Sequence, residues 1–209
     1  MKIFLAILLF IIAFFAFVYI AEIVVIHKDY AIDIYLQSFV ESHRSPAAKW
    51  FFNGITFLGS HFFLLPAYLI LIAIFFNKKR KHTALNIALV GISSTALLFL
   101  CKDIFKRQRP GNPLIHAANG FSFPSGHSFS SFTFYGIIAY LIWRGKMHQW
   151  KKIALTIFLV LLASIISYSR IYLRVHYPSD IIAGFCLSIV WLILSFVVLT
   201  RAHFLKNRY

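Results

Sequence analysis

Three short clusters of ionisable and hydroxyl-bearing residues interrupt a chain that is otherwise strongly apolar. They are residues 102–110 (KDIFKRQRP), 123–127 (FPSGH) and 169–180 (SRIYLRVHYPSD). Ionisable side chains close to a membrane core are costly, and they are functional candidates by default. Together the clusters supply cations, a helix start, histidines and a carboxylate, which is the equipment for binding and transferring a phosphoryl group.

The first cluster contains two cations with helical spacing. Lys102 and Arg109 are seven residues apart, so we expect them to share one face of a helix that Pro110 ends. Taken alone, the pattern also fits a basic helix end whose side chains reach out to the membrane surface. Three further cations either attract anionic headgroups or are ordinary solvated charges, namely Lys106, Arg107 and Arg174.

The second cluster has the composition of an anion-binding helix start. Ser125 is a good N-cap residue, and Gly126 lets a ligand approach the backbone closely. The first N–H groups of a helix bind anions, and His127 would then stand beside the anion. Without the other clusters, a plain cap and turn is the alternative.

The third cluster joins a histidine to a carboxylate. Asp180 follows His176 by four residues, so it can hold one ring nitrogen and leave the other as a nucleophile or base. Arg170 adds a guanidinium that suits phosphate. A structural histidine–aspartate bond at a helix start is the alternative for this cluster alone. The sequence has no convincing metal-ligand spacing and no Gly-rich nucleotide loop.

These clusters resemble the three-part signature of the type 2 phosphatidic acid phosphatase superfamily. The family's patterns are Lys-x6-Arg-Pro, Pro-Ser-Gly-His and Ser-Arg-x5-His-x3-Asp, and all eleven specified positions agree in order. The matching residues are Lys102, Arg109, Pro110, Pro124, Ser125, Gly126, His127, Ser169, Arg170, His176 and Asp180.

The resemblance implies a metal-independent lipid phosphatase without a cofactor, with six membrane helices and an outward-facing site, as in short bacterial members. It implies that His176 is the nucleophile that forms a phosphohistidine and that Asp180 orients it. His127 would protonate the leaving oxygen and then activate water. The implied ligands of the substrate phosphate are Lys102, Arg109, Ser125, Gly126 and Arg170.

The rest of the chain must hold these clusters in a membrane. Apolar residues make up 60% of the 209 residues and charged residues only 13%, against about 25% charged in an ordinary soluble domain. This excludes a disordered chain and a soluble domain with a normal polar surface. Six apolar segments approach the ~20 residues that a membrane helix needs, which predicts an all-α bundle of six transmembrane helices. Their expected spans are 3–26, 57–76, 83–101, 127–143, 153–169 and 180–200.

Three features outside the clusters leave alternatives open or predict no function. Segment 29–56 mixes acids with apolar residues, which fits either an amphipathic helix on the membrane surface or a helix packed on the bundle. Glu22 is either an interfacial carboxylate or the partner of a site cation. Cys101 and Cys186 lie in apolar runs and are expected to be small buried side chains.

The net charge of +15 is best explained by orientation in a membrane rather than by nucleic acid. The N-terminus, the C-terminal tail and loops 77–82 and 144–152 together carry 12 basic residues and no acid. By the positive-inside rule this side is cytoplasmic. The clusters then lie on the outer face, with the other nine basic residues and all six acids. We therefore expect a multi-pass protein of a bacterial cytoplasmic membrane with both termini inside.

These observations predict one domain over residues 1–209, with its motif-bearing core at 102–180. The expected activity is hydrolysis of the terminal phosphate of a lipid phosphate or diphosphate at the outer leaflet. Family analogy ranks undecaprenyl diphosphate first, before phosphatidylglycerophosphate and phosphatidic acid. The alternatives are a lipid phosphoryl or head-group transferase that uses the same site, and a non-catalytic lipid-phosphate binder or transporter. Apart from the lipid substrate and the bilayer, no partner is predicted.

Overall fold

The structure is a computed structural model that describes residues 2–115 and 120–206, and every regular element in these ranges is a helix. The α-helices are α1 (Lys2–Ala21), α2 (Ala31–Ser42), α3 (Pro46–Ile55), α4 (His61–Asn77), α5 (Lys81–Phe105), α6 (Gly126–Arg144), α7 (Gln149–Tyr172) and α8 (Pro178–Lys206). A π-helical turn (Glu22–Ile26) extends α1, and a 3-10 turn (Thr56–Gly59) joins α3 to α4. The all-α prediction is confirmed.

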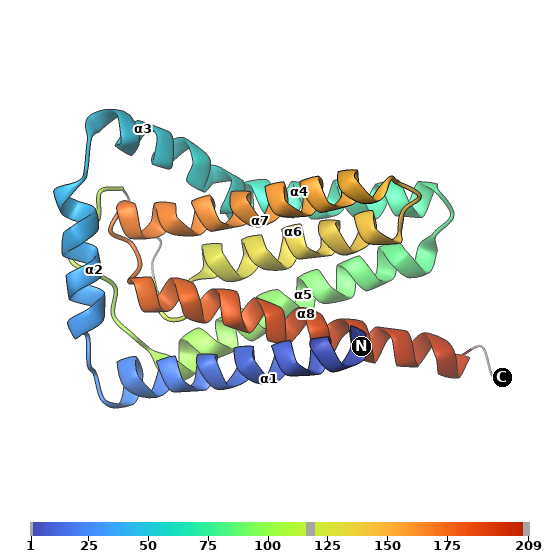
Figure 1. The fold of residues 1–209 in the computed structure, drawn as a ribbon, viewed down its shortest axis with the longest axis horizontal. Helices are drawn as coiled ribbons and strands as arrows, with labels where there is room; N and C mark the ends of the chain where they lie inside the picture. Colours follow the sequence, from blue (N-terminus) through green and yellow to red (C-terminus); the bar gives the residue numbers. More distant parts are fainter. Residues whose placement is uncertain (1, 116–119, 207–209) are drawn as a thin grey trace.

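Helix α6 is the central element of the bundle. It packs against α7 and α8 and also contacts α4 and α5, while α1 packs along α8. The long helices run side by side, and α2 crosses one end of the bundle (Figure 1). Buried apolar side chains of α4, α6 and α7, such as Leu64, Phe134 and Ile166, form one part of the core. The outward faces of the helices stay apolar, as lipid contact requires.

Six separate spans are not confirmed. Among the described residues, four helices are long and apolar enough to cross a membrane: Ile3–Ile26, Lys81–Phe105, Gln149–Tyr172 and Pro178–Leu199. A fifth span results if Pro46–Gly59 and His61–Asn77, which meet at an angle of 41°, count as one. The chain is therefore a polytopic helical membrane protein with four or five candidate spans.

Helix α6, expected as the span 127–143, is the segment that does not qualify. Its first half carries hydroxyl side chains, and Ser128, Ser131 and Thr133 are fully buried. The reason is position, because a helix surrounded by other helices does not need a lipid-compatible surface.

The segment 29–56 forms α2 and α3, and α2 packs on the end of the bundle. Its Gln37 side chain donates a hydrogen bond to the carbonyl of Ile171 on α7, and Asp33 is only 3% exposed. These contacts show that α2 packs on the bundle, while apolar side chains on its other face, such as Ile32 and Tyr35, are exposed. Glu22 lies 3.6 Å from His27 at an exposed position, and both cysteines are buried free thiols.

The bundle has two chemically different ends. The basic loops after α4 and α6 lie together at one end (Figure 1). The connections α5–α6 and α7–α8 lie at the other end, where α2 crosses. All three sequence clusters therefore meet at the end that α2 covers.

Candidate active site

Lys102 and Arg109 converge on one backbone carbonyl. Lys102 Nζ donates to the Phe121 oxygen at 2.6 Å, and Arg109 Nη2 donates to the same oxygen at 3.4 Å. Among the described residues, neither side chain is paired with a carboxylate within 4 Å. Two neighbouring cations without an acidic partner form a site that is ready to accept an anion.

These two cations do not share a helical face, so that expectation was wrong. Helix α5 ends at Phe105, because Lys106 takes a left-handed conformation with φ 47° that closes the helix. Arg109 therefore lies in the connection to α6. The chain folds back through this connection, and tertiary contact brings Arg109 beside Lys102.

His176 is held between a carboxylate and a guanidinium. Its Nδ1 lies 3.4 Å from Asp180 Oδ2 and 3.2 Å from Ser122 Oγ, and its Nε2 lies 3.2 Å from Arg109 Nη1. With Nδ1 protonated and Nε2 unprotonated, both ring nitrogens form hydrogen bonds: Nδ1 donates to Asp180, and Nε2 accepts from Arg109. The Nε2 lone pair then points at the cationic region.

Burial keeps His176 neutral. The side chain is 2% exposed, and this burial lowers the pKa of His176 from 6.5 to about 3, although Asp180 acts in the opposite direction. A neutral imidazole is the form that can act as a nucleophile. Asp180 is itself anchored, because Oδ2 also accepts from Ser122 Oγ at 2.5 Å and from the Tyr177 N–H at 2.9 Å.

The start of α6 lies against the start of α8. Ser125 is the N-cap of α6, accepting from the Ser128 N–H, and its own N–H donates to the Asp180 carbonyl at 3.0 Å. Ser128 Oγ donates to the Ile181 carbonyl at 2.8 Å. The first turn of α6, with Gly126 and His127, is thereby fixed next to the histidine–aspartate pair.

Arg170 and His127 occupy the side of the site that faces the 3-10 turn Thr56–Gly59 between α3 and α4. Arg170 is 4% exposed, and its Nη1 donates to Thr56 Oγ1 at 2.8 Å. Burial lowers the pKa of His127 well below 6.5, and the neighbouring charges of Arg170, His176 and Arg109 act in the same direction. The structure thus places all eight predicted site residues in one region, formed by α5, α6, α7, α8 and their connections.

Sequence reasoning missed a buried ion network behind the histidine. Arg107, which was expected at the surface, is 5% exposed and donates to Asp180 Oδ1 at 2.7 Å and to Asp33 Oδ2 at 2.6 Å. Asp33 also accepts from the backbone N–H and the hydroxyl of Ser179. Arg174 is partly buried and pairs with Glu41 of α2.

One signal in the sequence pointed to this network. The chain has only six acids for 21 basic residues, and a buried cation requires an acidic partner. Asp33 stands in the amphipathic segment whose placement was left open. Ser122 and Thr56 carried no signal, because single hydroxyl residues in loops are common.

No group of three or more His, Cys, Asp or Glu side chains suited to a metal ion occurs within residues 2–115 and 120–206. Fold and site define the class as an integral membrane protein with a cationic, histidine-containing site suited to phosphate esters.

Comparison with known proteins identifies the family. The PAP2 superfamily pattern matches residues 82–204. Phosphatidylglycerophosphatase B of Bacillus subtilis is 35% identical over 150 residues, covering 70% of this chain and 73% of that protein. Lipid A 4'-phosphatase of Bacteroides thetaiotaomicron is 30% identical over 169 residues, covering 73% of this chain and 70% of that protein.

A solved structure agrees with this result. The crystal structure of a transmembrane PAP2-type phosphatidylglycerolphosphate phosphatase from Bacillus subtilis superimposes with a TM-score of 0.82 at 30% identity. The match covers 90% of this chain and 94% of that chain. The chain belongs to the PAP2 superfamily and is a membrane lipid phosphatase, a phosphomonoester hydrolase. The family resemblance seen in the three motifs is confirmed.

Proposed function

We propose that this phosphatase removes the terminal phosphate of a membrane lipid at the outer leaflet through a phosphohistidine on His176. The observation that carries the proposal is the two-sided clamp on the imidazole. Nδ1 faces Asp180, while Nε2 faces the Arg109 guanidinium at 3.2 Å. This geometry aims an unprotonated nitrogen at the place where two cations can hold a phosphate.

The first step forms a nitrogen–phosphorus bond from His176 Nε2 as the bond from phosphorus to the leaving oxygen breaks. Burial and the nearby cations favour neutral His127 in the free protein, but the negative charge of the bound phosphate favours its protonated form, which donates its proton to that oxygen. Lys102, Arg109, Arg170 and the start of α6 at Ser125 and Gly126 bind the phosphate oxygens and stabilise the charge that develops on them. Asp180 stabilises the imidazolium character that His176 gains.

The second step reverses the roles of the two histidines. His127, now unprotonated, takes a proton from water as the water oxygen attacks phosphorus. The nitrogen–phosphorus bond breaks, which releases inorganic phosphate and returns neutral His176. No group other than these side chains and water is needed for the balance of the two steps.

The substrate is a lipid phosphate monoester or diphosphate. The relative from Bacillus subtilis at 35% identity bears the name phosphatidylglycerophosphatase B, which adds weight to phosphatidylglycerophosphate beside undecaprenyl diphosphate and phosphatidic acid. We further propose that residues 1–209 form a single domain. The end with the basic loops faces the cytoplasm, because clustered Lys and Arg without acids favour that side.

The test is phosphate release from a panel of detergent-dispersed undecaprenyl diphosphate, phosphatidylglycerophosphate and phosphatidic acid. We expect release from at least one of them, and we expect an excess of EDTA to leave the rate within about twofold, since the proposed roles all fall on side chains. Loss of activity in EDTA that a divalent ion restores would contradict the metal-independent mechanism.

The same assay separates the alternatives. A second lipid with a free hydroxyl group is added, and the products are analysed. Transfer of phosphate to that lipid in place of release would show a transferase. Binding of all three lipids without turnover would show a non-catalytic binder and would contradict the proposal.

A further inference from the structure

Arg107 lies outside the set of phosphate ligands. Its Nη1 donates to Asp180 Oδ1 and Ser179 Oγ, and its Nη2 donates to Asp33 Oδ2, all within 2.7 Å. The guanidinium also lies over the rings of Tyr30 and Tyr177, with its central carbon 4.9 Å and 4.3 Å from their centroids. Both terminal nitrogens are therefore committed to acidic or hydroxyl partners, so they are not available for substrate.

The network joins α2 to the nucleophile. Asp33 belongs to α2, Arg107 to the α5–α6 connection and Asp180 to α8, and the three side chains are 3%, 5% and 0% exposed. A planar guanidinium can bridge two carboxylates with fixed geometry, which an ammonium group cannot. We propose that Arg107 is a positioning residue, held by Asp33, that orients the Asp180 carboxylate behind His176 and offsets its charge.

This inference rests on the proposed role of His176 and predicts how pH affects the rate. The titratable and charged groups that face His176 are Asp180 on α8, Arg109 in the α5–α6 connection, Lys102 on α5 and His127 on α6. Arg107 acts on the ring through Asp180, whose Oδ1 it binds while Oδ2 faces His176. Without the Arg107 charge, Asp180 would stabilise the imidazolium more strongly, so the pKa of His176 would rise. Because the unprotonated ring attacks, the acid limb of the pH–rate profile would then move to higher pH.

The experiment uses full-length protein with Arg107→Lys and with the double change Asp33→Asn/Arg107→Gln. The double variant removes one charge of each sign, so Asp33 is not left buried and unpaired. We expect kcat to fall about 100-fold in both, because a small misplacement of the nucleophile has an effect of that size. KM should change less than about twofold, since Arg107 does not bind phosphate. Only the double variant, which loses the Arg107 charge, should move the acid limb of the pH–rate profile to higher pH.

The matched control is Arg174→Gln. Arg174 lies two residues before His176 and forms another ion pair to α2, with Glu41, but it has no contact with Asp180. We expect its kcat and acid limb to equal those of the unaltered protein. An equal loss in Arg174→Gln would show that α2 docking alone matters, and a change confined to KM would make Arg107 a phosphate ligand. Either result overturns the inference, whereas an active His176→Ala variant would overturn the proposed function itself.

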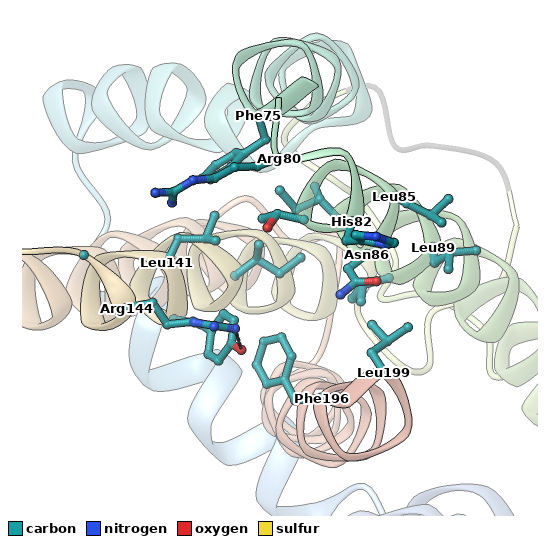
Figure 2. A pocket seen from close by; sticks show the side chains of 16 residues that line it. Phe75, Arg80, His82, Leu85, Asn86, Leu89, Leu141, Arg144, Phe196 and Leu199 are labelled. Atoms are coloured by element: carbon teal, nitrogen blue, oxygen red, sulfur yellow. Dashed lines mark hydrogen bonds between the residues drawn. The ribbon is translucent and has the colours of Figure 1, made fainter. Parts of the chain in front are cut away.

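A second, independent observation concerns a cavity at the opposite end of the bundle. It has a volume of about 740 Å³, within the range of about 300–1,000 Å³ usual for ligand sites, and lies between α4, α5, α6 and α8. Figure 2 shows Arg80 and Arg144 on one side of it and Leu85, Leu89 and Leu199 on the other. None of the residues that line it is acidic.

The charge and shape of this cavity fit one occupant. Arg144 donates from Nη1 to Tyr140 Oη at 3.0 Å, which holds its guanidinium at the cavity wall. Two guanidiniums without an acidic residue among the described residues that line the cavity suit a phosphate diester, and the leucine side suits an acyl chain. We infer that an anionic glycerophospholipid binds here, with its headgroup at Arg80 and Arg144.

The test is native mass spectrometry of the protein after reconstitution in equal amounts of phosphatidylglycerol and phosphatidylcholine. We expect the unaltered protein to retain phosphatidylglycerol preferentially. Arg80→Gln/Arg144→Gln should lower that retention about tenfold, because each Arg near an anionic headgroup contributes attraction. The control Lys78→Gln/Lys151→Gln removes two charges from the same end of the bundle, at residues that do not line the cavity. It should retain phosphatidylglycerol as well as the unaltered protein does. Equal retention in both double variants, or full displacement by inorganic phosphate alone, would overturn the inference.

Discussion

His176→Ala is expected to lower phosphate release at least about 1,000-fold, which is the effect typical of removing a nucleophile from a preorganised site. The cationic cradle of Lys102 and Arg109 would remain, so the variant should still bind the lipid phosphate. The change removes a ring that is 2% exposed, and we expect a modest loss of thermal stability together with the loss of rate. Phosphate release with a lipid substrate, measured beside a binding assay, checks both parts.

The matched control is His27→Ala. His27 is an exposed imidazole at the end of α1 that lies beside Glu22, and it is not one of the residues that contact His176. It should retain the activity of the unaltered protein. A His176→Ala variant with near-normal phosphate release would show that the nucleophile lies elsewhere. A phosphorylated protein trapped from the unaltered chain but not from His176→Ala would be direct support.

Gly184→Ala is expected to reduce kcat/KM about 100-fold by moving the start of α6, since a displacement of about 1 Å at a catalytic site has an effect of this size. A Cβ on Gly184 would lie 2.8 Å from the Ser125 carbonyl oxygen, 3.0 Å from Ser128 Cβ and 3.1 Å from the Phe129 nitrogen. Two of these atoms belong to the backbone, so no side-chain rotation can make room. Helix α8 would have to separate from the turn that carries Gly126 and His127.

Overpacking of this kind lowers the free energy of unfolding by about 1–3 kcal/mol, which a thermal unfolding assay in detergent would detect. The control is Gly54→Ala, in helix α3, where a Cβ would meet nothing within 4 Å. Both changes raise helix propensity by about the same amount, near 1 kcal/mol, so their difference isolates the contact with α6. Unchanged kcat/KM in Gly184→Ala would show that the two helices can separate without disturbing the site.

Local pattern in the sequence was sufficient for the class and the motifs. Long apolar segments indicated a helical membrane protein, and the spacing of Lys102, Arg109, His127, His176 and Asp180 indicated phosphate chemistry and the family. These inferences hold because hydropathy and motif spacing depend on residues close together in the chain. The same dependence on neighbouring residues explains two errors. The shared helical face of Lys102 and Arg109 and the separate span at 127–143 were wrongly expected, because both depend on contacts with other parts of the chain.

Only the tertiary structure decided which charges are buried together. Arg107 looked like a surface cation because its partners Asp33 and Asp180 are 74 and 73 residues away, and no local pattern encodes such a distance. Likewise, only the tertiary structure showed that segment 29–56 packs on the bundle through the buried Asp33. The sequence by itself determined which groups are present, and the packing of α2, α5 and α8 determined which of them share a low-dielectric environment, where a charge must find its partner.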